Sequence, residues 1–551
     1  MMSSLKFNTI IKNATIYNGT GEESYCADVG ICGDQIAAIG NLNADGANVV
    51  EAQGLSLMPG IIDVHTHYDA QITWDPTLSP SPSMGVTTAV MGNCGFGIVP
   101  CPPEHQDIML KNLSVVEGMN LKTLLEGTQW KFESFPEYLN YIKEQRPHAN
   151  VAVLIGHSAV RTAVMGEDSS VRITPTVNEL DAMRAIVDDA LAHGAIGFAS
   201  SFSPNHSGYG GRPMPSTIAE DEELYALLEP IKKRNGVFVT AGGQRATPEY
   251  LENISKTYDC PTFLVSVLAM HNDSDPTAST DYYRRCEAAL NRGQEVYIHA
   301  NPHPLSFDFT LRNPYIFYAH EAFNTVKVAD PEQLVPIYQS KAFRKKFQED
   351  LSKNTIGAIF NGAWEKIELD EVPITKLAKE AGQDPLNWLF DQSLDTQFVG
   401  KMYQNNDEGV AKLLSHPNAI IALSDAGAHV EFLCDAGFGL YFLQHWVNDM
   451  GTFSLTHAVR KLTSEPAARY RIKQRGQIKE GYFADLVLFN PNNIGISKLY
   501  RVDDLPGQGS RLMRQASGIH GVWVNGTRVI FEENNEPPKQ GPGYLLTEFD
   551  F

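Results

Sequence analysis

Short apolar runs alternate with helical patterns over most of this 551-residue chain. Runs rich in Val and Ile are typical of strands buried on both faces. Such strands alternating with amphipathic helices predict an α/β fold with a parallel sheet, which a barrel closes on itself. The expected strands are Ile61–Val64, Val151–Ile155, Ile196–Phe198, Val237–Thr240, Thr262–Leu268, Val296–Ile298 and Ile420–Leu423, and the clearest expected helices are Thr176–Ala192, Asp221–Arg234 and Asp281–Arg292.

The composition of the chain argues against some classes of binding partner. The net charge of −21 argues against nucleic acid or an anionic membrane as a partner. We see no apolar run long enough to cross a bilayer and no apolar signal core at the N-terminus. Seven cysteines without a framework spacing favour free thiols over disulfides. These features predict a cytoplasmic protein, and they leave open whether it forms a homo-oligomer.

Two histidines mark the end of the first expected barrel strand. His65 and His67 directly follow Ile61–Val64, and residues i and i+2 of a strand point to the same face. In a (β/α)8 barrel this places both imidazoles at the C-terminal mouth, where active sites lie. Two convergent imidazoles begin a divalent metal site, and zinc suits mixed histidine and carboxylate ligands. Two partly buried histidines bonded to main chain are the plainer alternative, which the flanking Pro-Gly and Tyr-Asp disfavour.

Four ordered motifs resemble the amidohydrolase superfamily, and within it the D-aminoacylase (N-acyl-D-amino-acid deacylase) branch. They are the His-x-His strand, 85–95 with Gly92-Asn93-Cys94-Gly95, 150–166 and 194–201. The resemblance implies a (β/α)8 TIM-like barrel with a small β-sandwich domain built from both chain ends. We place the sandwich in residues 1–60 and 471–551, and the barrel in 61–470 with an insertion near 307–418. An ordinary helical excursion on the barrel wall is the alternative for the insertion.

The resemblance assigns roles to two further residues. Cys94 stands where the family has a metal-binding cysteine, although an inert buried thiol is the default for a free cysteine. Asp425 ends the last expected strand, where the family aspartate binds metal and handles the proton of the attacking water. Its alternative role is a helix N-cap. The expected metal ligands are therefore His65, His67, Cys94 and Asp425, with Asp425 also catalytic.

The sequence departs from the family at the fifth and sixth strands. The family has a histidine at each strand end, but 237–245 has none, and His271 comes several residues later than expected in the other stretch. Either a single metal ion uses His65, His67 and Asp425 with Cys94 nearby, or other histidines substitute. The candidates are His157, His206, His271 and His299.

Three residues are expected to contact substrate. His157 lies at a strand end within a matched motif, and Arg161 follows it by four residues. A guanidinium at the mouth could bind a carboxylate in a bidentate manner, or it could form a salt bridge within the loop. His429, after Asp425, could orient substrate, bind metal or simply be a hydrogen-bonded loop histidine.

The resemblance implies a metal-dependent hydrolase of a small molecule. Its expected substrate has a linear amide bond, as in an N-acyl-D-amino acid, which a metal-activated water would cleave. Two alternatives stay open: hydrolysis of a cyclic amide or lactone, and a barrel that has lost metal ligands and catalysis and serves in binding.

Overall fold

The computed structural model describes residues 6–43, 46–265, 271, 275–353, 358–403, 406–531 and 538–549. Residues 266–268 of the expected sixth barrel strand lie outside this set. Within it, no helix has the length and apolar character needed to span a membrane.

Eight parallel strands form the central sheet of the described chain. Their order follows the chain from β6 to β12 and ends on β17. Beyond the outer strands, Thr66 and Ala426 form a single parallel bridge that joins the two edges. The strands are completely buried, which explains their apolar sequences. They are β6 (Ile61–Asp63), β7 (Val86–Met91), β8 (Asn150–Gly156), β9 (Gly197–Ser201), β10 (Val237–Ala241), β11 (Thr262–Val265), β12 (Val296–Ala300) and β17 (Ala419–Ile421).

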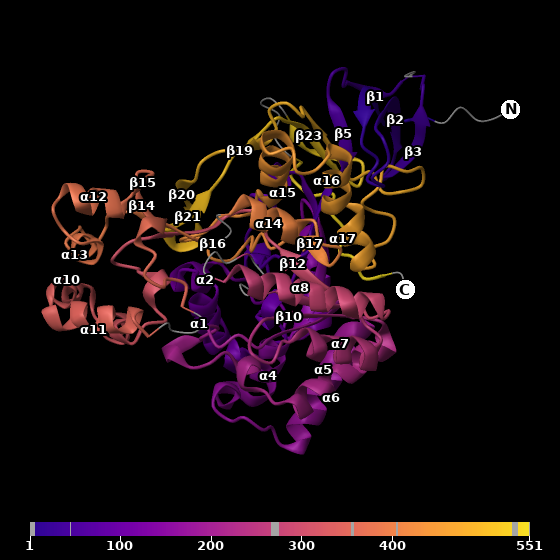
Figure 1. Ribbon diagram of the computed structural model, residues 1–551. Coiled ribbons are helices and arrows are strands. Elements are labelled where there is room, and N and C mark those ends of the chain that lie inside the picture. The colour runs from indigo at the N-terminus through magenta and orange to yellow at the C-terminus, as the bar shows by residue number, and fades with distance from the viewer. Residues whose placement is uncertain are drawn as a thin grey trace.

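Helices follow the strands and surround the sheet (Figure 1). Several begin with side-chain caps. At the start of α5 the Thr176 hydroxyl accepts a hydrogen bond from Glu179 N, and the Glu179 carboxylate accepts one from Thr176 N. The helices of the barrel region are α1 (Gln106–Val116), α2 (Leu121–Gly127), α3 (Phe135–Gln145), α4 (His157–Met165), α5 (Val177–Ala192), α6 (Asp221–Arg234), α7 (Pro248–Tyr258), α8 (Pro276–Asn291), α14 (Asp407–Leu414), α15 (Phe438–Tyr441), α16 (Leu455–Leu462) and α17 (Ser464–Arg469).

A second sheet joins the two ends of the chain, seen in Figure 1 as indigo and yellow strands at the top. Its order is β24-β23-β18-β5-β1-β2-β3, and β4 also pairs with β1. β5 continues through Gly60 into barrel strand β6, so the second sheet leads directly into the barrel. The expected fold class, a barrel with a small β domain from both ends, is confirmed. The strands are β1 (Thr9–Ile16), β2 (Tyr25–Cys32), β3 (Gln35–Gly40), β4 (Asn48–Glu51), β5 (Ser56–Pro59), β18 (Leu486–Phe489), β23 (Ile519–Val524) and β24 (Thr527–Phe531).

The segment between β12 and α14 has its own small sheet and an aromatic core. The sheet has the order β13-β16-β14-β15, and Phe side chains in edge-to-face contact, such as Phe323, Phe347 and Phe390, pack together beside it. In Figure 1 it projects from the barrel beside β20 and β21. Asp308 N donates to Phe432 O (2.9 Å), which ties the segment to the loop after β17. Its elements and the neighbouring strands are β13 (Leu305–Phe309), α9 (Asn324–Lys327), α10 (Leu334–Gln339), α11 (Lys341–Leu351), β14 (Ile367–Leu369), β15 (Val372–Pro373), α12 (Ile374–Glu380), α13 (Pro385–Phe390), β16 (Phe398–Tyr403), β19 (Gly495–Ile496), β20 (Tyr500–Leu505), β21 (Gly509–Met513) and β22 (Ala516–Ser517).

Candidate metal centre

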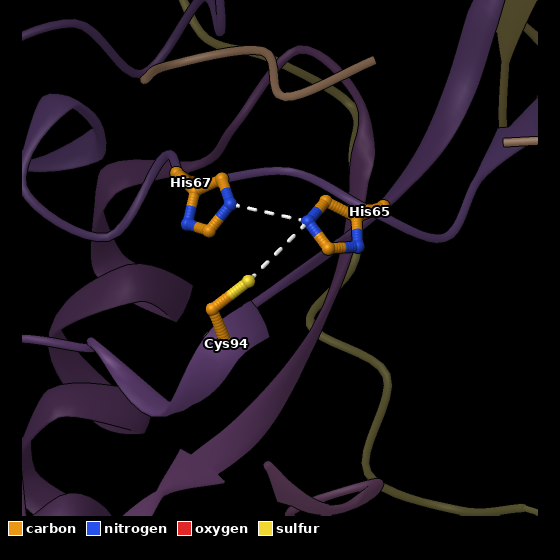
Figure 2. A group of neighbouring side chains, drawn as sticks. All are labelled: His65, His67 and Cys94. Carbon is orange, nitrogen blue, oxygen red and sulfur yellow. Dashed lines mark hydrogen bonds between the residues drawn. The ribbon is translucent and has the colours of Figure 1, made fainter. Parts of the chain in front are cut away.

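Three potential metal ligands converge beyond the ends of β6 and β7. One ligand atom each from His65, His67 and Cys94 lies within 4.8 Å of the others. Figure 2 shows the two imidazoles and the thiol turned toward one another. His65 Nε2 is 3.2 Å from His67 Nε2 and 3.8 Å from Cys94 Sγ. All three residues are buried, so the group forms a compact nitrogen and sulfur donor set.

The Gly-Asn-Cys-Gly turn after β7 aims the thiol at the histidines. Gly92 has φ 85°, and a Cβ there would stand 2.3 Å from Leu154 O, so this position requires glycine. Cys94 itself adopts φ 54°. The Asn93 amide donates to Val90 O (2.9 Å) and also reaches Thr66 O (3.3 Å). Asn93 therefore links the turn to the His-x-His segment.

Asp425 completes the group from the other edge of the sheet. Its Oδ1 is 3.0 Å from His65 Nε2 and 3.4 Å from His67 Nε2. The loop that carries it begins directly after β17, and His67 N donates to Ala426 O (2.7 Å). Two imidazoles, one thiolate and one carboxylate form a four-donor set of the kind that zinc binds.

The four side chains shift one another's pKa values. Burial lowers the pKa of His65, but hydrogen bonds to Asp425 and Cys94 outweigh it and raise that pKa to about 9. Burial raises the pKa of the Cys94 thiol, yet contacts with His65 and His67 bring it below its ordinary value. Burial also opposes ionisation of Asp425, and the same histidines hold its pKa well below 3.8. These contacts favour ionisation of the Cys94 thiol and of the Asp425 carboxyl group, and a divalent cation can replace the imidazolium protons.

Glu117 supports His67 from behind, and sequence reasoning missed it. Its Oε1 lies 3.2 Å from His67 Nδ1, the ring nitrogen opposite the one that faces Asp425. The residue is 2% exposed and caps the C-terminus of α1. A carboxylate on the second nitrogen of a ligating histidine fixes its orientation and tautomer. No local pattern distinguishes this glutamate from an ordinary helix-end residue.

His429 lies at the edge of the group. Its main-chain N donates to Glu117 O (2.6 Å), and its ring contacts Phe432. The side chain is 19% exposed, so it can still meet a ligand at the mouth. The structure therefore brings His429 next to the centre through Glu117 and not as a fifth member of the His65 group.

The structure places His157 and Arg161 outside this group of side chains, and their expected contact with substrate stays a prediction. His157 is fully buried, and its ring nitrogens contact Ser200 Oγ (2.9 Å) and Glu223 Oε1 (2.8 Å). Arg161 is also fully buried and donates to the main-chain carbonyls of residues 173 and 215. In this arrangement the guanidinium is bonded to main-chain carbonyl groups and has no exposed surface.

The candidate replacement histidines do not join the group either. His206 Nδ1 pairs with Ser201 Oγ (2.7 Å), and His271 is buried against α14, where a Cβ on Gly409 would overlap its ring. His299 lies behind His65, with Nδ1 facing Nδ1. Among the described residues, the ligand group around His65 contains none of these three. Substitution by one of these histidines for a missing ligand therefore stays a prediction, and His206 is the nearest to it, because its charge interacts with His65, His67 and Asp425.

Comparisons with known proteins found a family model and relatives that cover most of this chain. The amidohydrolase family matches residues 48–530. The D-aminoacylase of Alcaligenes xylosoxydans xylosoxydans is 29% identical over 544 residues, 96% of each chain. The N-acyl-D-aspartate deacylase of the same organism is 27% identical, over 98% of this chain and 95% of the relative.

A solved D-aminoacylase structure, studied for the role of its binuclear metal centre, superposes with a TM-score of 0.67 at 26% identity. The superposition covers 98% of this chain and all of that one. The expected resemblance is thus confirmed. Because the family match spans most of the sequence and the barrel carries its histidine pair at the mouth, this chain belongs to the amidohydrolase family.

Proposed function

We propose that this chain is a metal-dependent hydrolase that deacylates N-acyl-D-amino acids. The observation that carries the proposal is the grouping of His65, His67 and Cys94 at the barrel mouth, with the Asp425 carboxylate against both histidines. The donor set of two nitrogens, one sulfur and one oxygen fits a single zinc ion. The three named relatives in the comparison act on D-amino-acid derivatives or carry the name D-aminoacylase, which supports this substrate class.

The expected ion supplies general chemistry at this site. A bound divalent ion lowers the pKa of a water ligand and polarises an amide carbonyl. Asp425 is ionised and lies at the centre, so it can accept the proton of the attacking water. The same carboxyl group then returns the proton to the leaving amine nitrogen. Glu117 holds the His67 ring in the orientation that exposes Nε2 to the centre.

A side chain can contact substrate at the barrel mouth only where part of it is exposed. We propose that His429, with its 19% exposed side chain beside Phe432, contacts the substrate. The buried His157 and Arg161 have no part in recognition in this proposal. The protein would act in the cytoplasm on a small molecule, which the seven free cysteines support, since thiols persist in a reducing compartment.

A paired assay tests the function. Purified protein is screened against N-acyl-D- and N-acyl-L-amino acids, and its zinc content is measured by elemental analysis on the same sample. We expect about one zinc ion per chain, from the single four-donor set, and hydrolysis of the D series. The double variant His65→Ala, His67→Ala should lose both the metal and the activity while keeping its circular dichroism spectrum.

The matched control is His193→Ala, which removes an exposed histidine on the outer end of α5. It should leave metal and activity unchanged. Hydrolysis of only the L series or of cyclic amides would contradict the substrate class. Unchanged zinc in the double variant would contradict the metal centre itself.

A further inference from the structure

The second ring nitrogen of His65 faces another histidine. His65 Nδ1 lies 3.2 Å from His299 Nδ1, with the two rings perpendicular. His299 is on β12, and the centroid of its ring lies 5.3 Å from that of His65. Both residues are completely buried. Solvent therefore does not compete for this contact.

The contact continues to a buried tyrosine. His299 Nε2 is 2.8 Å from the hydroxyl of Tyr470, which follows α17 and has no exposed surface. Phe263 of β11 stacks on the Tyr470 ring with centroids 4.3 Å apart. Three side chains from separate parts of the barrel thus form one line: His65, His299 and Tyr470.

The chemistry of metal binding fixes the direction of the hydrogen bonds along this line. His65 Nε2 faces Asp425 and Cys94, so it must be unprotonated to bind an ion. The remaining proton of the neutral ring is then on Nδ1, which donates to His299 Nδ1. His299 must accept there, so its own proton is on Nε2 and points to the Tyr470 oxygen.

His299 is also excluded as a direct ligand in this geometry. The ring nitrogens of His65 point in divergent directions, and His299 meets the one turned away from Cys94 and Asp425. A residue in this place can act on an ion only through His65. It occupies the position that a carboxylate or carbonyl takes behind most ligating histidines.

We propose that His299 and Tyr470 are positioning residues that lock His65 in its Nδ1–H tautomer and hold Nε2 toward the metal. The inference rests on the proposed metal centre. The main chain of His65 is fixed independently, because Ser424 Oγ donates to its carbonyl oxygen (3.1 Å). The His299 contact therefore controls the orientation and tautomer of the ring alone.

A pair of variants with the same shape tests this role. His299→Asn keeps an oxygen near the Nδ1 position that can accept from His65, whereas His299→Leu has similar size and cannot accept. Zinc affinity is measured by competition with a chromophoric chelator, so the readout does not depend on turnover. We expect His299→Leu to weaken zinc binding about 10–100-fold, as loss of such partners does elsewhere, and His299→Asn to recover most of it.

Phe263→Leu is the control, because Phe263 packs on the same tyrosine and makes no hydrogen bond to the line. It should lower the melting temperature and leave zinc affinity unchanged. If His299→Leu does not fold, Tyr470→Phe serves as the second variant for the same measurement of zinc affinity. Loss of the hydroxyl should weaken zinc binding by a smaller factor, because His299 can then rotate its ring.

The outcomes separate this inference from the proposed function. Wild-type protein that binds no zinc would defeat the metal centre and the inference together. Wild-type zinc binding with equal affinities for His299→Leu and His299→Asn would overturn the positioning role alone. Equal loss of affinity in Phe263→Leu and His299→Leu would also overturn it, since packing and not the hydrogen bond would then hold His65.

Discussion

Three residues at or beside the proposed metal centre have a left-handed backbone conformation. Cys94, Asp425 and His429 have φ values of 54°, 49° and 55°, and none is glycine. Such conformations cost on the order of 1 kcal/mol or more for most residues and concentrate at functional sites. Asp425 adopts this conformation in the loop after β17, and its carboxylate lies 3.0 Å from His65 Nε2. The sequence motifs indicated these residues, but their backbone strain appears only in three dimensions.

Asp425→Asn tests the proton-transfer role with little disturbance of the backbone. Asparagine tolerates left-handed φ and nearly preserves the shape, so the loop should keep its course. The amide cannot accept the proton of the water, and general-base catalysis typically contributes about 10²–10⁴-fold. We expect kcat to fall by at least that range, with a smaller change in KM. Turnover within about tenfold of wild type would remove Asp425 from the mechanism and leave His429 as the next base to test.

Cys94→Ser tests whether the thiol contacts the ion. The substitution exchanges a soft thiolate for a weak neutral ligand, so zinc affinity should fall. In the cobalt-substituted protein, the sulfur-to-metal charge-transfer absorption should disappear, while absorption from the remaining ligands stays. Cys101→Ser is a matched control, because Cys101 is also buried but its thiol bonds to Pro102 O and to none of the four donors. A cobalt spectrum that Cys94→Ser leaves unaltered would make Cys94 a packing residue.

The sequence predicted a residue of the site only where that residue lies in a recognisable motif. His65, His67, Cys94 and Asp425 follow strand ends in recognisable patterns, and the structure brings all four together. Glu117 follows a helix, far from any such pattern, and only the fold reveals that it faces His67. His157 and Arg161 lie in a matched motif, but both side chains are buried on α4. The sequence alone does not show which face of this helix points at the barrel mouth.

At the scale of elements, buried strands and capped helices were the most predictable parts. The expected helix Asp221–Arg234 matches α6, and Thr176–Ala192 differs from α5 by its cap residue alone. Strand ends shifted by one or two residues, as in Ile420–Leu423 against β17 (Ala419–Ile421). Leu423 could not continue the strand because its φ is 74°. Apolar character predicts where a strand lies but not where its hydrogen bonds stop.

Helix α5 should contribute stability that depends on pH through its capping glutamate. Hydrogen bonds from Arg172, opposed by burial and helped by Thr176, lower the pKa of Glu179 from 4.5 to about 2. A carboxyl group with a lowered folded-state pKa stabilises the fold above its unfolded pKa. This stabilisation is therefore complete above pH 4.5 and is lost as pH falls toward 2.

The comparison of wild type with Glu179→Gln isolates that charge, because glutamine can still complete a capping box. Urea unfolding should show the variant to be less stable at pH 7, with the difference shrinking as pH falls below 4.5. The side chains of Arg172 and Glu179 are 33% and 22% exposed, so added salt should reduce the difference. A difference that is independent of pH would show that the charge does not contribute.

At the scale of the whole molecule, the barrel has a weak seam between its first strand, β6, and its last strand, β17. The proposed metal centre spans this seam. In the described chain β6 pairs with β7 and β17 with β12, and no ladder joins β6 to β17. Beyond the ends of β6 and β17, the Thr66–Ala426 bridge and the hydrogen bond from His67 N to Ala426 O close the barrel. His65 and His67 belong to one edge of this seam, and Asp425 to the other. An ion bound by all three would therefore connect the first and last strands.

Removal of the metal should consequently loosen the molecule at this seam first. An ion that binds only the folded state adds about 2.7 kcal/mol of stability when its free concentration is about 100 times Kd. We expect a chelator to lower the melting temperature and to speed hydrogen exchange at the amide of His67, whose acceptor is across the seam. The amide of Val237, which donates to Ile196 O on the far side of the barrel, is the internal control and should exchange at an unchanged rate. In the double variant His65→Ala, His67→Ala, the chelator should have no effect on either quantity, because the centre is already lost. Faster exchange spread evenly over both amides would show that the ion stabilises the chain as a whole and does not close the barrel.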